Sequence, residues 1–318
     1  MISIVIPLWN EEEGVGALLS RLSELREAAP FPLELVLVDD GSTDKTAETL
    51  APLLPSFPHW KLIHLSRNFG QQAAYRAGLD CATGDAVVFL DADLQDPPEL
   101  IPEMVRRWEA GAKVVVACRQ SRPERGLRGV LLNLFHRVFK LATGGAMPEN
   151  SGTFGLMDRV VAQHVRALPE VNLFLPALRT WFGYQQEIVW YHRAARTGQP
   201  KQTFRKLISY AWDGLTSFSE WPLKLIGLAG LVISALGFCY ASVLIFIKAA
   251  QFFGFFRDLI VMGFTTLAVA VLFMGGIQLL CLGIIGEYIA RAYRETKQRP
   301  IYIVERMEQS SASRTDES

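Results

Sequence analysis

The segment Ala86-Val87-Val88-Phe89-Leu90-Asp91-Ala92-Asp93 decides which fold this sequence predicts. Its first five residues are apolar and rich in β-branched and aromatic side chains, which favours a short buried strand over a helix. Two carboxylates follow where the strand ends. The two prolines of the next segment, Leu94–Glu99, stop the sheet and suit the first turn of a helix.

These carboxylates are candidate metal ligands. Ligands of open α/β sheets bind beyond the carboxyl ends of the strands. Asp91, Asp93 and the amide oxygen of Gln95 are hard oxygen donors, which suit a divalent cation that would in turn hold a diphosphate. An Asp-x-Asp pair is common in loops, however, so the neighbouring strands have to support the assignment.

Other apolar segments also end in polar loops. Ile2–Ile6, Leu33–Val38 and Trp60–Leu65 are predicted strands, and Val15–Glu27 is a predicted helix with leucines at helical spacing. This alternation predicts a βαβ series in an α/β fold, in which the loops after the strands meet at one edge of the sheet.

The loop after the second predicted strand contains Asp39, Ser42 and Asp44. Ser42 or Asp44 can cap the helix that begins near Lys45, which is an ordinary structural role. Asp39 is not needed for such a cap. It is therefore a candidate ligand-binding residue, with a role in the turn as the alternative.

Arginines follow the predicted helix Glu99–Ala110 and the predicted strand Val114–Cys118. Arg119, Arg125 and Arg128 lie in the polar segment beyond that strand. A guanidinium group binds phosphate oxygens through two parallel hydrogen bonds, so arginines beside a metal site favour phosphate recognition. The alternative is a solvated basic loop.

The composition limits the class of protein. The 318 residues carry no net charge and are 50% hydrophobic, and the mean hydropathy is +0.20, which is high for a soluble protein. No basic stripe supports a nucleic-acid partner. The N-terminus is expected to be a strand and not a signal peptide. Four widely spaced cysteines predict free thiols in a reducing compartment: Cys81, Cys118, Cys239 and Cys281.

Four motifs occur in the order Ile4–Glu11, Val38–Asp44, Ser66–Gly70 and Leu90–Glu99. Together they resemble those of family 2 glycosyltransferases, whose catalytic domain has the GT-A fold, a Rossmann-like α/β fold with a mostly parallel sheet. The narrower resemblance is to the polyprenyl-phosphate glycosyltransferases, which include dolichol-phosphate mannose synthase and the bacterial enzymes that load glucose or aminoarabinose onto undecaprenyl phosphate.

The resemblance implies roles for individual residues. Asp39 would bind the uracil or guanine base, with Pro7, Asn10 and Glu11 lining the same pocket. Asp91, Asp93 and Gln95 would coordinate Mg²⁺ or Mn²⁺ on the donor diphosphate, so that Asp91 also belongs to the nucleotide site. The residues with an implied catalytic role are Asp93, Arg119, Arg128 and Lys201.

The implied reaction is an inverting transfer of a sugar from a nucleotide-sugar, with a UDP-sugar as the favoured donor. The acceptor is undecaprenyl phosphate, a phosphate monoester whose second pKa is about 6, so it is largely dianionic at neutral pH. It therefore needs little help from a general base. The product would be a lipid-linked sugar for envelope glycans or lipid modification.

The sequence departs from the family pattern at two places. Thr153 stands where relatives usually have an acid, and Pro200-Lys201-Gln202 replaces their Ser-Lys-Tyr. Asp158 is better explained as a helix cap than as a substitute for that acid. Thr153 and Arg196 are assigned to the acceptor and sugar side, and the sugar specificity stays open.

Two uncharged segments predict a membrane module. Leu225–Ile247 and Leu259–Gly286 each exceed the ~20 residues needed to span a bilayer. The short segment Lys248–Asp258 between them makes the two spans a hairpin. Basic residues are more numerous outside the hairpin than in that segment, which places the catalytic domain in the cytoplasm, at the bacterial inner membrane.

The predicted organisation is a catalytic domain at 1–195, an amphipathic region at 196–222, a membrane hairpin at 223–286 and a C-terminal segment at 287–318 whose end is disordered. The amphipathic region is expected to lie in the membrane interface, with packing on the catalytic domain as the alternative. Glycines in both spans favour close helix approach and a homo-oligomer, with a tetramer as one form considered.

Two other functions stay open. A processive polysaccharide synthase has the same fold, but the Gln-x-x-Arg-Trp motif expected of it does not match Leu178-Arg179-Thr180-Trp181. A non-catalytic membrane scaffold descended from such an enzyme would explain Thr153 and Pro200. Intact metal ligands argue against the scaffold.

Overall fold

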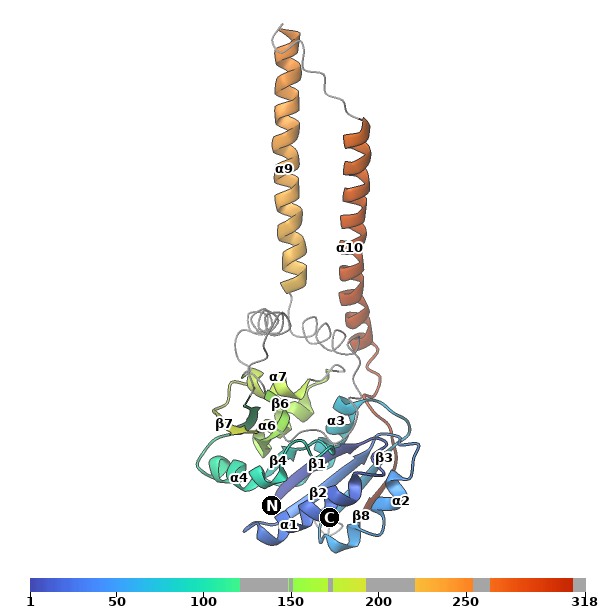
Figure 1. Ribbon diagram of the computed structural model, residues 1–318, viewed down its shortest axis with the longest axis vertical. Coiled ribbons are helices and arrows are strands. Elements are labelled where there is room, and N and C mark those ends of the chain that lie inside the picture. The colour runs from blue at the N-terminus through green and yellow to red at the C-terminus, as the bar shows by residue number, and fades with distance from the viewer. Residues whose placement is uncertain (121–147, 149–150, 171–173, 193–220, 254–263, 311–318) are drawn as a thin grey trace. The chain divides into compact units, whose positions relative to one another are not determined.

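The computed structural model describes residues 1–120, 148, 151–170, 174–192, 221–253 and 264–310 of the chain. The chain divides into two compact units, one formed by Met1–Ile208 with Gln298–Ser318 and the other by Ser209–Lys297. The first contains a β-sheet and the second contains two long helices (Figure 1).

Among the described residues, the first unit contains one eight-stranded sheet with the order β7-β5-β6-β4-β1-β2-β3-β8 (Figure 1). The strands are β1 (Ile2–Leu8), β2 (Leu33–Asp39), β3 (Trp60–Leu65), β4 (Ala86–Phe89), β5 (Val114–Arg119), β6 (Ser151–Asp158), β7 (Gln186–Tyr191) and β8 (Val304–Gln309).

The strands β4, β1, β2 and β3 run parallel to one another and form the predicted βαβ series. Beyond β4, strand β6 runs antiparallel to both β4 and β5, and β7 runs parallel to β5. At the other edge, β8 runs antiparallel to β3. The predicted α/β fold with a mostly parallel sheet is therefore confirmed.

Helices cover both faces of this sheet. They are α1 (Val15–Ala28), α2 (Thr46–Leu50), α3 (Gln71–Cys81), α4 (Ile101–Glu109), α6 (Arg159–Ala167) and α7 (Leu175–Trp181), with short 3₁₀ turns η1 (Leu54–Ser56) and η2 (Pro98–Leu100). Alternate residues of β1 enter two apolar cores, because successive side chains of a strand point to opposite faces. Ile4 packs in the core that contains Leu18 of α1, and Val5 packs in the core that contains Tyr75 of α3.

Two arginines join α3 to α6 by capping each other's helix ends. Arg76 of α3 donates to the carbonyl oxygen of Val165 (3.1 Å), and Arg166 of α6 donates to the carbonyl oxygens of Leu79 (2.9 Å) and Ala82 (2.6 Å). The last carbonyls of a helix have no partner within the helix, so both ends gain charge-assisted hydrogen bonds.

Most of the predicted elements agree with the structure. The third strand has its predicted bounds, α1 begins at the predicted Val15, and Asp158 caps α6 by accepting from the Val160 N–H (2.9 Å). The predicted helix at Glu99–Ala110 begins instead with the 3₁₀ turn η2. The sequence pattern predicts no strand at Val304–Gln309, and Gln309, predicted as the start of the disordered tail, is the last residue of β8.

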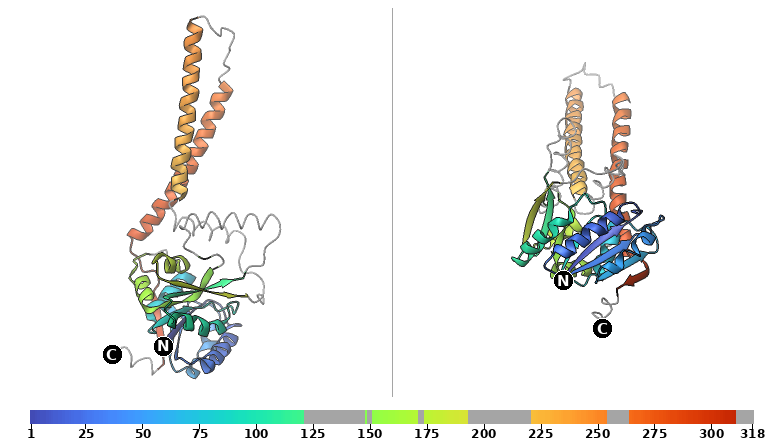
Figure 2. Two further views of the ribbon diagram at one scale, coloured as in Figure 1. Left: turned by 90° about the vertical axis from the view of Figure 1, so that its left-hand side faces the viewer. Right: turned by 60° about the horizontal axis from the view of Figure 1, so that its bottom comes forward.

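The second unit contains α9 (Trp221–Phe252) and α10 (Phe264–Thr296), which Figure 2 shows as two long helices. Within them, Ile226–Ile247 and Phe273–Thr296 are long and apolar enough to cross a membrane, with hydropathies of 2.3 and 1.6. The first agrees closely with its predicted span, whereas the second lies further toward the C-terminus than the predicted Leu259–Gly286. The predicted interfacial region lies almost wholly outside the described residues.

Candidate active site

The acidic residues lie where the parallel strands end. Asp39 is the last residue of β2, Asp91 follows β4, and Arg119 is the last residue of β5. In the sheet register Asp39 pairs with Leu8 of β1 and with His64 of β3, so the ends of these strands are adjacent. The predicted common edge is therefore present.

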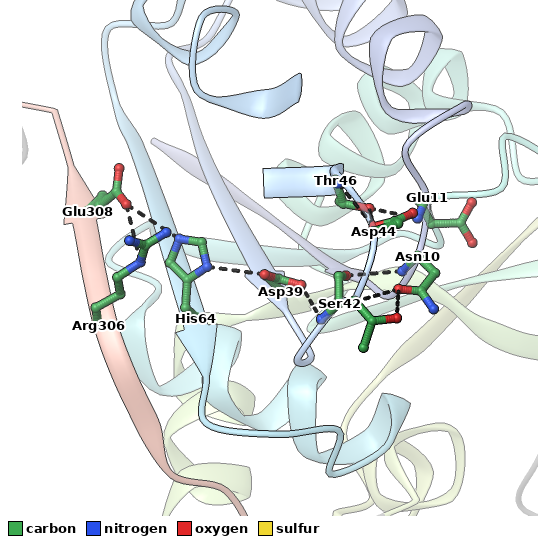
Figure 3. A network of polar contacts seen from close by, with 10 residues as sticks. Asn10, Glu11, Asp39, Ser42, Asp44, Thr46, His64, Arg306 and Glu308 are labelled. Atoms are coloured by element: carbon green, nitrogen blue, oxygen red, sulfur yellow. Dashed lines mark hydrogen bonds and ion pairs between the residues drawn. The ribbon is translucent and has the colours of Figure 1, made fainter. Parts of the chain in front are cut away.

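Asp39 is held by its neighbours at this edge (Figure 3). The Ser42 N–H donates to Asp39 Oδ1 (3.0 Å), and Nδ1 of His64 lies 3.1 Å from Asp39 Oδ2. Burial favours the neutral acid, but the hydrogen bonds from His64 and Ser42 outweigh it and lower the pKa of Asp39. The side chain is thus a carboxylate at neutral pH and acts as a hydrogen-bond acceptor.

The loop after β1 is bonded to the loop after β2 (Figure 3). The Asn10 N–H donates to Ser42 Oγ (3.0 Å), and Asn10 Oδ1 accepts from the Thr43 N–H (2.8 Å). The Glu11 N–H donates to Thr46 Oγ1 (2.9 Å). Ser42 therefore joins the two loops and does not cap α2; Asp44 instead accepts from the N–H of Thr46, the first residue of α2 (3.0 Å).

A cavity of about 580 Å³ opens beside Asp39. Its walls come from the loops after β1, β2 and β3 and from β8. The lining residues include Trp9, Asp39, Ser42, His64, Arg67 and Arg306. Pro7, Asn10 and Glu11 are not among the described lining residues, although Asn10 bonds to Ser42 and Thr43, which are.

Asp40 fixes the loop that closes the cavity after β3. Its two carboxylate oxygens accept from the backbone N–H groups of Phe69 (2.7 Å) and Gly70 (2.9 Å). Gly41 has φ +66°, and a Cβ there would lie 2.5 Å from the carbonyl carbon of Arg67. A glycine is therefore needed for the two loops to approach.

Asp91 and Asp93 are held by different kinds of donor. Asp91 Oδ1 accepts from Gln71 Nε2 (2.6 Å) and from the Tyr75 hydroxyl (2.6 Å), both on α3. Asp93 Oδ1 accepts from the Gln95 N–H (3.1 Å). Leu94, between Asp93 and Gln95, has φ +55°, a strained backbone conformation for a residue with a side chain. The chain therefore turns sharply at this point.

The buried acid Asp96 lies in the same region as Asp91 and Asp93. Asp96 accepts a hydrogen bond from the Tyr191 hydroxyl, and its Oδ2 lies 3.6 Å from Arg119 Nη2. Arg119 Nε also donates to the Tyr191 hydroxyl (3.1 Å). Burial raises the pKa of Asp91, and the charges of Asp96 and Asp93 raise it further against the Tyr75 hydrogen bond.

The residues at this edge fit a divalent cation. The negative charges of Asp96 and Asp93 raise the pKa of Asp91, which means that the three carboxylates repel one another. A bound cation would neutralise part of this negative charge. Among the described residues, no three His, Cys, Asp or Glu side chains form a group that could hold a metal ion. The predicted set of Asp91, Asp93 and Gln95 has only two carboxylates, and diphosphate oxygens would complete it.

The remaining predicted site residues divide into two groups. Thr153 lies on β6, where its carbonyl oxygen and that of Gly152 accept from the buried guanidinium of Arg179 (3.2 and 2.6 Å). Arg128, Arg196 and Lys201 lie outside the described residues. Sequence reasoning assigned no role to Asp40, Gln71, Tyr75, Asp96 or Tyr191. Asp40 and Asp96 lie in the loops that follow β2 and β4, whereas only the folded structure brings Gln71, Tyr75 and Tyr191 to this edge.

Comparisons with known proteins extend this description. Residues 3–166 match the family model "Glycosyl transferase family 2", and residues 221–292 match "GtrB C-terminal hairpin". The chain is 43% identical over 305 residues to the uncharacterized glycosyltransferase sll0501 of Synechocystis sp., covering 95% of this chain and 94% of that protein. It is 39% identical over 310 residues to the bactoprenol glucosyl transferase of Shigella phage SfV, covering 97% and 99%.

A solved structure of a mycobacterial protein matches with a TM-score of 0.50 at 21% identity, over 68% of this chain and 72% of that chain, which shows a shared fold. The sheet and its acidic edge thus define a glycosyltransferase of the GT-A fold. The chain belongs to glycosyl transferase family 2, and its C-terminal helices form the hairpin of that second model. The predicted family resemblance and enzyme class are confirmed.

Proposed function

We propose that this enzyme transfers a sugar from a nucleotide-sugar, a UDP-sugar, to a membrane polyprenyl phosphate with inversion at the anomeric carbon. The observation that carries this proposal is the gathering of Asp39, Asp91, Asp93 and Arg119 at one edge of the sheet, in a chain with two apolar helices. A cavity opens at this edge beside Asp39. The name of the phage relative, a bactoprenol glucosyl transferase, supports the acceptor.

The base of the donor binds at Asp39. An ionised carboxylate accepts the ring N–H that uracil and guanine both present, and the pKa of Asp39 is lowered by its hydrogen bonds, so it is ionised at neutral pH. The cavity of about 580 Å³ beside this carboxylate accommodates a nucleoside. Asn10 shapes the cavity through its bonds to Ser42 and Thr43.

The diphosphate of the donor lies at Asp91, Asp93 and Gln95. Bound there, Mg²⁺ or Mn²⁺ would act as a Lewis acid that neutralises charge on the departing nucleoside diphosphate. Arg119 adds a fixed positive charge, and Asp96 and Tyr191 orient its guanidinium. Arg128 and Lys201 are also proposed to contact phosphates; both lie outside the part of the chain that the structure describes.

The acceptor phosphate attacks directly, because a phosphate monoester is largely dianionic at neutral pH and needs no strong base. Thr153, on β6, belongs to the acceptor and sugar side together with Arg196. A single displacement forms the new bond from phosphate oxygen to anomeric carbon as the bond to the nucleoside diphosphate breaks. The anomeric configuration therefore inverts.

We place the hairpin in the bacterial inner membrane, with the catalytic unit in the cytoplasm, where nucleotide-sugars are made. The apolar segments of α9 and α10 support insertion, and the basic residues outside the hairpin support this orientation. The glycines of both helices support self-association.

A transfer assay tests the proposal. Full-length protein in detergent is incubated with undecaprenyl phosphate, Mg²⁺ or Mn²⁺, and a panel of labelled UDP- and GDP-sugars. We expect labelled lipid from one donor, and a fall of at least 10²-fold in Asp93→Asn, because a charged ligand at the diphosphate is lost. Asp85→Asn is the matched control, since Asp85 lies just before β4, at the opposite end from Asp93, and bonds to the N-terminal amine (2.8 Å).

Two outcomes would change the conclusion. Binding of a nucleoside diphosphate without transfer from any donor would favour the scaffold, and Thr153→Asp would then test whether the missing acid restores turnover. Elongation of a sugar polymer without consumption of the lipid phosphate would favour a processive synthase.

A further inference from the structure

Strand β8 forms part of the wall of the cavity beside Asp39, although it follows both long helices in the sequence. Glu305 and Arg306 of β8 line this cavity together with Asp39 and His64. The matched family models end at residues 166 and 292, so neither includes β8. The cavity is therefore built from two distant parts of the chain.

The segment around β8 is fixed to the sheet at both ends. The Ser66 N–H donates to the carbonyl oxygen of Ile303 (2.9 Å), and the Ser310 N–H donates to that of Trp60 (3.0 Å). The Tyr302 hydroxyl donates to Asp80 Oδ2 of α3 (2.8 Å). These bonds hold the strand in one register.

That register places β8 side chains against His64. Arg306 pairs with His64 and Glu308 pairs with Leu62, so both side chains lie on the face of the sheet that carries the imidazole. The pairing becomes irregular between His64 and Leu65, next to the cavity. An irregularity of this kind re-aims side chains at the edge of a sheet.

The imidazole of His64 lies between two carboxylates (Figure 3). Nδ1 is 3.1 Å from Asp39 Oδ2, and Nε2 is 3.5 Å from Glu308 Oε1. Arg306 Nε is 3.5 Å from the same oxygen of Glu308. His64 is 5% exposed, and among the described residues its buried Nε2 has no hydrogen-bond partner. Packing and the Asp39 contact therefore hold the ring at Nδ1, and Glu308 is the acid that faces it at ion-pair distance on the Nε2 side.

We propose that β8 is a specificity element of the nucleotide site, in which Glu308 is a positioning residue that orients His64 and, through it, the base-binding carboxylate of Asp39. This inference rests on the proposed function, because it assumes that a nucleoside occupies the cavity. Glu308 acts without touching the donor. Its loss weakens binding of the nucleoside half of the donor and leaves the diphosphate half unaffected.

Direct binding tests this role without turnover. Calorimetry on full-length protein in detergent measures UDP and GDP binding to the parent, Glu308→Gln, His64→Gln and the double variant. For the nucleotide that the parent prefers, we expect Kd to rise about tenfold in Glu308→Gln, as for loss of one contact to a charged group. The double variant should bind within about twofold of His64→Gln, because Glu308 acts through His64.

Kinetics and a matched control separate positioning from general damage. Glu308→Gln keeps the shape of a side chain that is 45% exposed. The matched control is Met307→Ala, which changes the neighbouring β8 residue; Met307 is not among the residues that line the cavity. We expect a raised KM for the donor with kcat within about threefold, an unchanged KM for the lipid phosphate, and unchanged competition by inorganic diphosphate. Met307→Ala should match the parent.

The results distinguish the two proposals. Three outcomes would overturn the role of β8 while leaving the proposed sugar transfer intact. Glu308→Gln could bind UDP and GDP as the parent does, the losses in the double variant could be additive, or binding of inorganic diphosphate could be lost equally. A parent protein that binds neither nucleotide and transfers no sugar would overturn the proposed function as well.

Discussion

Asp91 is half-buried, and its Oδ1 accepts hydrogen bonds from two donors of α3, Gln71 and Tyr75, each at 2.6 Å. Burial raises the pKa of this carboxyl, and the Tyr75 hydroxyl opposes that rise. Tyr75 is itself buried, and its own pKa is raised well above the usual value, so it stays a neutral donor. The phenol thus favours the ionised acid at the diphosphate end of the site.

Tyr75→Phe removes this donor and leaves the ring. We expect the pKa of Asp91 to rise further, so that the acid limb of the pH profile of transfer moves to higher pH. The transfer rate should fall most at the acid end of the profile, by up to about tenfold, the effect of losing one hydrogen bond to a charged group. Tyr184→Phe is the control, because its hydroxyl bonds to His164 (2.9 Å) at an exposed site. An unshifted limb in Tyr75→Phe would contradict the role of the phenol.

Which site residues can be predicted from sequence depends on how they reach the site. Asp39 and Asp91 follow apolar strand segments directly, and the carboxyl ends of parallel strands share one edge. Asp96 reaches Arg119 and Tyr191 only because β5 pairs with β7, with Arg119 opposite Tyr191. That pairing joins segments separated by more than 60 residues, and no local pattern encodes it.

At the scale of elements, a local sequence pattern predicts the central strands but not the edge strand β8. β1, β2 and β4 are buried on both faces and therefore read as continuous apolar runs. β8 has the sequence Val-Glu-Arg-Met-Glu-Gln and is largely exposed, so its hydrophobic pattern predicts no strand. It is recognised as a strand only by its hydrogen bonds to β3.

The start of α6 is stabilised by one buried acid. Asp158 accepts from the Val160 N–H (2.9 Å), from Trp108 Nε1 (2.8 Å) and from Lys113 Nζ (2.9 Å). Asp158→Ala should lower the free energy of unfolding by about 1–3 kcal/mol near pH 7, because a helix cap is lost and the half-buried Trp108 and the Lys113 ammonium lose their acceptor. Thermal unfolding of both proteins measures the difference.

The pH dependence of that difference has a defined sign. Burial raises the pKa of Asp158, but the hydrogen bonds from Trp108 and Lys113 outweigh it and lower the pKa below its unfolded value of 3.8. The stabilisation by the charged form is therefore fully present above the unfolded pKa and is lost as pH falls through the folded pKa. We expect a constant difference between the parent and Asp158→Ala from pH 7 to about pH 5, and a smaller one below pH 4. A difference that grows on acidification would contradict this assignment.

At the scale of the whole molecule, the hairpin predicts that both of its flanks lie on one side of the membrane. A protein without its four native cysteines carries one new cysteine, either at the exposed Ser56 or at Asp258 between the predicted spans. A membrane-impermeant maleimide should label Asp258→Cys from outside the inner membrane and should label Ser56→Cys at least tenfold more after lysis. Equal labelling of Ser56→Cys and Asp258→Cys before lysis would overturn the predicted topology, in which the two positions lie on opposite sides of the membrane.

Because β8 follows the second long helix, the sheet cannot be completed in the order of synthesis. Strand β3 ends at Leu65, and its partner begins at Val304, which leaves 238 residues between them (66–303). At roughly 5–20 residues per second, the ribosome needs on the order of 10–50 s to bridge that interval. During this time β3 exposes an unpaired edge, which is the kind of surface on which nascent chains aggregate. Biogenesis of this enzyme therefore favours either rapid membrane insertion of the hairpin or a chaperone that shields β3 until the last strand arrives.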